Sequence, residues 1–83
     1  MKILYFARIR QIAGRSSDEI EVPASVTTVR ELIDFLSERD SSLASAFAER
    51  RTVKAAINQN LVPHDAVIAG ATEIAFFPPV TGG

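Results

Sequence analysis

The sequence has no cysteine and a single histidine among its 83 residues. The absence of thiols excludes disulfides, thiolate nucleophiles, cysteine metal ligands and persulfides on this chain. With His64 as the lone histidine, a site with several histidine ligands is also excluded, and no metal site is expected. No pairing of a nucleophile with a base is visible, so we expect no catalytic activity from this chain on its own.

A strong charge of one sign and a long apolar run are missing as well. The formal net charge is −1, whereas a protein that binds the phosphate backbone of nucleic acid needs a clustered basic surface. No run of 18 apolar residues is present, and the first residues lack the long apolar region of a secretory signal. We therefore expect one small cytoplasmic domain with no nucleic-acid partner and no membrane partner.

Apolar stretches bounded by turn residues predict the strands. Strands are expected at residues 2–6, 19–22, 53–57 and 73–77, with a short return strand at 61–62. In the first strand, Ile3 and Tyr5 face one side while Leu4 and Phe6 face the other. The last strand repeats this pattern. A strand that is apolar on both sides is usually central and covered twice, so these two strands are predicted at the centre of a sheet.

Three helical segments are expected between the strands. The main helix should start with a capping box formed by Thr28 and Glu31, and it should run to about Arg39. A short helical turn at residues 7–14 should stop at Gly14. A second short segment is expected around residues 43–47.

The order of these elements predicts the fold class. Parallel pairing of the first and last strands, with the main helix across one face, gives an α+β fold of the ubiquitin-like β-grasp type with a mixed sheet. The domain is expected to cover residues 1–77. Residues 78–83 then form an extended tail that carries the terminal Gly-Gly.

The tail has an unusual composition. It contains Pro78, Pro79, Val80, Thr81, Gly82 and Gly83. Prolines and β-branched residues stiffen its base, and the two glycines leave its tip without side chains. Fully extended, six residues reach about 20 Å. The sequence therefore predicts a slim arm that can enter the active site of a partner.

The carboxylate of Gly83 is the one group of this arm that can react. An α-carboxyl with a pKa of about 3.3–3.7 is ionised at neutral pH. It can attack the α-phosphate of ATP in a partner's site, and a sulfur nucleophile can then displace AMP. This route needs no side chain of the chain itself, in agreement with the missing cysteine.

Three segments carry a resemblance to a known family. Residues 76–83, FFPPVTGG, resemble the C-terminal signature of the small subunits of molybdopterin synthase. The opening LYFA at residues 4–7 and the AINQ at residues 56–59 resemble the N-terminal strand and the central segment of that family. Residues 70–73 depart from the family, whose members often carry Asp-Gly-Asp-Glu there.

The resemblance implies a function and a set of partners. A ubiquitin-activating-type enzyme would adenylate Gly83 with ATP, and a sulfurtransferase or a persulfide would convert it to a thiocarboxylate (1-thioglycine). The arm would then enter the large synthase subunit, in an assembly of two small and two large subunits, and donate sulfur for the dithiolene of molybdopterin. The chain itself would bind no cofactor.

Several residues beyond Gly83 are candidates for partner contact. The tail residues 78–82 are expected to lie inside a partner. Phe6, Leu61 and Phe77 can form an apolar face on the side of the sheet away from the helix, or loops can cover them as ordinary core. Arg8 and Arg10 flank this region, whereas Arg50 and Arg51 fit a solvated loop better than a binding site.

Two alternative functions remain open at this point. The chain can be a sulfur carrier for another pathway, such as the synthesis of thiamine, thiolated tRNA or cysteine. It can also be a non-catalytic ubiquitin-like interaction module with an inert tail. Deletion of Gly83 separates the second alternative from a carrier.

Overall fold

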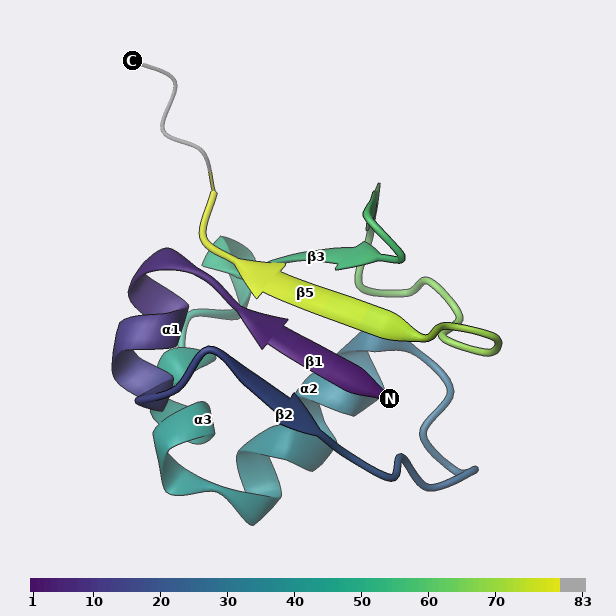
Figure 1. Ribbon diagram of the computed structural model, residues 1–83, viewed down its shortest axis with the longest axis horizontal. Helices are drawn as coiled ribbons and strands as arrows, with labels where there is room; N and C mark the ends of the chain where they lie inside the picture. Colours follow the sequence, from purple (N-terminus) through teal and green to yellow (C-terminus); the bar gives the residue numbers. More distant parts are fainter. Residues whose placement is uncertain (80–83) are drawn as a thin grey trace.

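The computed structural model describes residues 1–79, which form a mixed five-stranded sheet with its helices on one side (Figure 1). The strands are β1 (Lys2–Tyr5), β2 (Ser17–Glu19), β3 (Lys54–Ile57), β4 (Asn60–Val62) and β5 (Glu73–Phe77), and their order across the sheet is β2-β1-β5-β3-β4. The central pair β1 and β5 is parallel, and the other pairs are antiparallel. This is the predicted β-grasp fold. Residues 80–83 lie outside the described part, so what was expected of them stays a prediction.

The helices supply the second half of the core. They are α1 (Ala7–Ala13), α2 (Val29–Arg39) and α3 (Ser41–Ala46), followed by the 3-10 turn η1 (Arg50–Thr52). In Figure 1, α2 runs behind the strands. The largest fully buried side chains come from both layers: Tyr5, Phe47, Phe76, Ile3, Leu32, Ile33, Leu36, Leu43, Ile74, Val29 and Val53. One continuous apolar core therefore holds the helices against one face of the sheet.

The start of α2 is the predicted capping box. The Thr28 hydroxyl accepts a hydrogen bond from the Glu31 amide at 3.2 Å, and the Glu31 carboxylate accepts one from the Thr28 amide at 3.1 Å. These bonds satisfy amides that the helix leaves free at its N-terminus. The helix ends at Arg39, as its apolar periodicity indicated.

Residues with positive φ close the predicted turns. Gly14 follows α1 with φ of 78°, a left-handed conformation that glycine adopts without strain. Asn58 and Gln59 have φ of 47° and 72°, and they join β3 to β4 in a two-residue hairpin turn. The Asn58 side chain also accepts from the amide of Glu73 at 3.1 Å, which ties this turn to the start of β5.

The second strand begins earlier than predicted. Alternation at residues 19–22 suggested a strand there, but β2 spans Ser17–Glu19 and Asp18 lies opposite Ile3. The Asp18 carboxylate accepts a hydrogen bond from the Tyr5 hydroxyl at 2.8 Å. This hydrogen bond and the ion pair of Asp18 with Arg15 hold a polar segment in the strand. A strand of polar residues is not detected by a search for alternating apolar residues.

The prediction that β1 and β5 are covered on both faces is wrong. Ile3 and Phe76 are completely buried under the helices, but Leu4 and Phe77 on the opposite face are only partly buried. Phe6 lies just beyond β1, is 47% exposed, and donates its amide to the Phe76 carbonyl at 3.0 Å. All helices pack on the other side, so no helix of residues 1–79 covers the apolar residues of this face.

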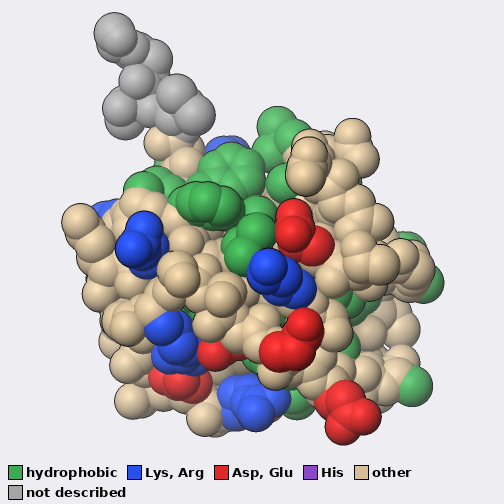
Figure 2. Space-filling model, in the orientation of Figure 1, with side chains coloured by type: hydrophobic (Ala, Val, Ile, Leu, Met, Phe, Trp, Pro, Cys, Tyr) green, Lys and Arg blue, Asp and Glu red, His purple; other side chains and the backbone are tan. Residues whose placement is uncertain are grey.

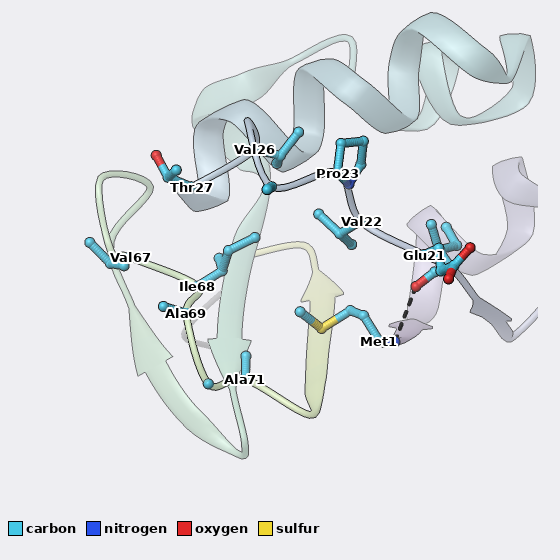
Figure 3. A pocket seen from close by; sticks show the side chains of 13 residues that line it. Met1, Glu21, Val22, Pro23, Val26, Thr27, Val67, Ile68, Ala69 and Ala71 are labelled. Carbon is cyan, nitrogen blue, oxygen red and sulfur yellow. Dashed lines mark hydrogen bonds between the residues drawn. The ribbon is translucent and has the colours of Figure 1, made fainter.

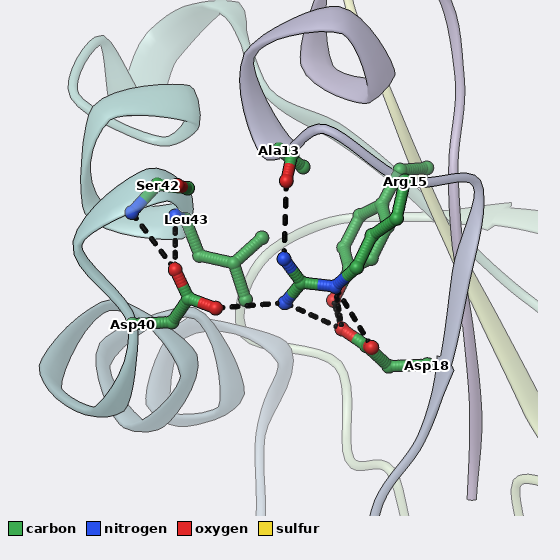
Figure 4. A network of polar contacts seen from close by, with 7 residues as sticks. Ala13, Arg15, Asp18, Asp40, Ser42 and Leu43 are labelled. Atoms are coloured by element: carbon green, nitrogen blue, oxygen red, sulfur yellow. Dashed lines mark hydrogen bonds and ion pairs between the residues drawn. The ribbon is translucent and has the colours of Figure 1, made fainter.

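A partly buried arginine, Arg15, links the sheet to the helical layer (Figure 4). The guanidinium of Arg15 donates to both oxygens of Asp18 at 2.8 Å, to Asp40 at 2.9 Å and to the Ala13 carbonyl at 3.0 Å. The hydrogen bond from Arg15 is the main reason why the pKa of Asp18 is lowered. Burial, and then the hydrogen bond to Asp18, raise the pKa of Tyr5. One side chain therefore joins β2, the end of α1 and the junction of α2 with α3.

The carboxylate of Asp40 also caps α3. It accepts from the amide of Ser42 at 2.8 Å and from that of Leu43 at 3.3 Å. Desolvation opposes its ionisation, but these amides together with Arg15 outweigh it and lower the pKa of Asp40. Both carboxyls that contact Arg15 are thus held in the charged form.

This network predicts how stability depends on pH. Because the folded-state pKa values of Asp18 and Asp40 lie below their unfolded values, their contribution is complete above the unfolded pKa of about 4 and is lost as the pH falls through the folded values. Arg15→Gln should be less stable than the parent chain at pH 7, and the difference should shrink below pH of about 4. Urea unfolding across this pH range measures it.

Arg39→Gln is the control for this measurement. Arg39 stacks on the ring of Phe35 and makes no ion pair with a carboxylate of residues 1–79. Arg39 borders the same hollow as Asp18 and Asp40 but bonds to neither, so the effect of Arg39→Gln on the free energy of unfolding should change much less with pH than that of Arg15→Gln. A difference for Arg15→Gln that stays constant from pH 7 to acid would contradict the electrostatic role of the network.

Candidate functional site

A row of apolar side chains crosses the uncovered face of the sheet. Leu4 in β1 pairs with Ala75 in β5, Ala75 pairs with Ala56 in β3, and Ala56 pairs with Leu61 in β4. Residues that pair across neighbouring strands point to the same face. The four side chains therefore form one stripe over four strands, and Leu61 at its end is 71% exposed.

Two aromatic residues extend this stripe toward the C-terminal end of β5. Phe77 is half-buried and pairs with Lys54, one step beyond the row. Phe6 follows the end of β1, which is parallel to β5. We call Leu4, Phe6, Ala56, Leu61, Ala75 and Phe77 the docking face. Figure 2, which looks onto this side of the sheet, shows hydrophobic side chains gathered below the base of the tail, with charged side chains around them.

The arm leaves the domain at the edge of the docking face. Pro78 is half-buried and borders a small hollow whose walls include Ile9 of α1 and Ala46 of α3. Pro79 is exposed. Neither proline offers an amide to a ladder, so β5 ends at Phe77 and the chain is released there. The sheet thus aims the start of the arm away from the core and beside an open apolar surface.

The predicted site residues fall into two groups. Phe6, Leu61 and Phe77 are brought together on one face, with no loop of residues 1–79 covering Phe6 or Leu61. Their role in partner contact stays a prediction, as does the role of Pro78 and Pro79. Val80, Thr81, Gly82 and Gly83 lie outside the described residues.

Sequence reasoning missed the middle of the docking face. The row is completed by Leu4, Ala56 and Ala75. The alternation of side chains along a strand assigns each of them to one side of its strand. The missing information was the register between strands and the choice of face that the helices cover. His64 is half-buried, and its Nε2 lies 2.7 Å from the Val53 carbonyl oxygen.

A second apolar hollow lies at the other end of the sheet (Figure 3). It is lined by Met1, Val22, Val26, Val67, Ile68 and Ala71 among others, and the ammonium of Met1 donates to the Ile20 carbonyl at 3.1 Å. It adjoins the starts of β1 and β5, whereas the arm leaves at the end of β5. Five strand residues span about 17 Å, so this hollow does not belong to the site at the base of the arm.

The described residues offer a surface for binding rather than a reaction centre. Residues 1–79 contain no group of three or more His, Cys, Asp or Glu side chains placed to hold a metal ion. No helix in that range is long and apolar enough to cross a membrane. The sheet can present an apolar face together with the arm that starts at the edge of this face.

Comparison with known proteins places the chain among small sulfur carriers. The model of the ThiS family matches residues 3–83. The molybdopterin synthase sulfur carrier subunit of Escherichia coli is 39% identical over 83 residues, covering 100% of this chain and 99% of that protein. The subunit of the same name from Haemophilus influenzae is 35% identical over 83 residues, with the same coverage of 100% and 99%.

Solved structures have the same fold. A putative molybdopterin converting factor, subunit 1, from Pyrococcus furiosus superimposes with a TM-score of 0.73 at 33% identity, covering 95% of both chains. SAMP1 from Haloferax volcanii also superimposes with a TM-score of 0.73, covering 100% of this chain and 98% of that one. At 24% identity, the second likeness concerns the fold alone.

The exposure of the docking face predicts an unusual tolerance to charge. Leu61→Asp should change the free energy of unfolding by no more than about 0.5 kcal/mol, because this side chain is 71% exposed. Phe76→Ala, on the buried face of β5, should cost about 3–5 kcal/mol. Urea denaturation measures both, and a Leu61→Asp chain as unstable as Phe76→Ala would mean that Leu61 belongs to the core.

Proposed function

Because the chain belongs to the ThiS family, we propose that it is the sulfur carrier subunit of a molybdopterin synthase. The observation that carries this proposal is the similarity over the whole chain to proteins of that name. The docking face and the arm beside it support the proposal, since a carrier must bring its C-terminus into the sites of other proteins. The chain then supplies no catalytic side chain, and catalysis belongs to its partners.

The proposed reaction starts at the carboxylate of Gly83. In the site of a ubiquitin-activating-type enzyme, a carboxylate oxygen forms a bond to the α-phosphorus of ATP, and the bond to the leaving pyrophosphate breaks. The product is an acyl adenylate. ATP is consumed in the partner, so the chain needs no cofactor of its own, and the cytoplasm is the compartment where we place this step.

Sulfur then replaces oxygen at the same carbon. A sulfur nucleophile supplied by a sulfurtransferase or a persulfide attacks the acyl carbon, and the bond to AMP breaks. With a persulfide the product is an acyl disulfide; a thiol of the donor system then attacks the donor's own sulfur, a disulfide forms on the donor, and Gly83 is released as the thiocarboxylate. The absence of cysteine from the chain fits this scheme, because its only sulfur nucleophile would be the one it carries.

The large synthase subunit is the proposed acceptor. In an assembly of two small and two large subunits, the docking face would bind the large subunit while the arm enters its pterin site. Stiff residues at the base of the arm reduce the cost of ordering it, which is about 1–2 kcal/mol for each flexible residue. The thiocarboxylate would there donate sulfur to form the dithiolene of molybdopterin.

The carrier role predicts a defined change of mass. After incubation with ATP, the cognate adenylating enzyme and a sulfur donor, the intact chain should gain the mass difference between one sulfur and one oxygen atom. Tandem mass spectrometry should assign this gain to Gly83. A chain without Gly83 should fold equally well and gain nothing.

The same experiment separates the alternatives. An unchanged mass in the presence of an enzyme proven active on another carrier would contradict sulfur carriage and favour an interaction module. A thiocarboxylate that the large synthase subunit does not consume would favour a carrier for another pathway.

The docking face predicts a selective loss of binding. Leu61→Asp places a charge in the apolar row and should weaken the complex with the large subunit at least tenfold, as loss of a buried apolar contact in an interface does. Val67→Asp is the matched control, since Val67 is 63% exposed but lies on the loop before β5, at the distant hollow. Titration calorimetry measures both, and equal losses would contradict the assignment of the face.

A further inference from the structure

Basic side chains gather in a hollow beside the edge strand β4. Arg30, Arg50, Arg51, Lys54 and His64 line it together with apolar residues, and none of its lining residues is acidic. The chain has nine Lys and Arg residues in total and a net charge of −1, so four of its nine cationic side chains meet here. We call this site the basic hollow. The sequence alone favoured a solvated loop for Arg50 and Arg51.

Most of these charges have no internal partner. Arg50 forms an ion pair with Asp34. Within residues 1–79, Arg30, Arg51 and Lys54 form no ion pair with a carboxylate, and all three side chains are exposed. The positive charge of the hollow is therefore available to a group outside the chain.

The walls of the hollow are connected by hydrogen bonds. The amide of Arg30 donates to the carbonyl of His64 at 2.8 Å, which joins the first turn of α2 to the segment after β4. The Nε2 of His64 lies 2.7 Å from the Val53 carbonyl oxygen, which joins that segment to the start of β3. The cationic residues thus come from three elements that are already held together, and binding needs no rearrangement of the backbone.

The basic hollow borders the docking face and the base of the arm. Lys54 is the register partner of Phe77, the last residue before the arm. A protein seated on the docking face and enclosing the arm would therefore extend over the basic hollow at its rim. Charged residues at the rim of an interface chiefly speed association, while the apolar centre holds the complex.

We propose that the basic hollow binds an acidic segment of the large synthase subunit and thereby steers the arm into it. This proposal rests on the proposed function. Arginine presents forked donors that fit carboxylates, and three arginines meet here. A nucleic acid fits less well, because the hollow is short and the whole chain carries a net charge of −1.

The test compares two variants with the same change of net charge. Arg30→Gln/Arg51→Gln removes two charges from the hollow and leaves the docking face intact. The control Arg39→Glu lowers the net charge by the same two units at one exposed position, the end of α2 on the helical side of the sheet. Stopped-flow association of each full chain with the cognate large subunit is measured in low salt and in 1 M salt, and melting temperatures confirm folding.

The hollow variant should associate roughly three- to tenfold more slowly than the parent chain in low salt, with dissociation nearly unchanged. The control Arg39→Glu should differ from the parent chain by less than about twofold, because Arg39 lies on the helical side of the sheet, away from the docking face. In 1 M salt the Debye length falls to about 3 Å, and all three rates should converge.

Two outcomes would overturn different claims. If the parent chain binds the large subunit and the hollow variant associates as fast as Arg39→Glu in low salt, the basic hollow has no part in docking, while the proposed function stands. If the parent chain neither binds the large subunit nor acquires a thiocarboxylate, the proposed function itself fails. The gain of mass at Gly83 and the rate of association thus test the two proposals separately.

Discussion

The parallel pairing of β1 with β5 is the contact on which the rest of the structure depends. It joins residues 2–5 to residues 73–76 in the centre of the sheet, with Ile3 opposite Ile74 and Tyr5 opposite Phe76. Because the two strands run in the same direction, both end at the same edge. Phe6 and Phe77 are consequently neighbours of the point where the arm leaves, although 70 residues separate them along the chain.

The two faces of this central strand pair differ in how deeply their side chains are buried. On one face, complete burial of Ile3, Tyr5, Ile74 and Phe76 under the helices supplies the apolar burial that a chain of 83 residues needs to fold. On the other face, apolar side chains remain partly open, as they do on surfaces that bind other proteins. The helices determine which face is buried, and the basic hollow places positive charge beside the edge of the open face.

Much of this arrangement could be predicted from the sequence, for reasons that lie in particular residues. The capping box of Thr28 and Glu31 and the positive φ of Gly14 and Asn58 are local, and local signals predict local structure. Which side of β1 is covered depends on where α2 packs, which alternation does not reveal. The start of β2 depends on the contacts of Asp18 with Tyr5 and Arg15, and the basic hollow forms only where three elements meet. Neither feature could be predicted, because both depend on contacts between residues far apart in the sequence.

We propose that the uncovered face and the arm together form the surface that the large subunit binds. An NMR titration of the isotope-labelled chain with that subunit tests it residue by residue. We expect perturbed signals for Phe6, Leu61, Phe77 and the arm, with Met1 and Val67 at the distant hollow unchanged. Perturbations centred on Met1 and Val67, with Leu61 and Phe77 unaffected, would contradict it.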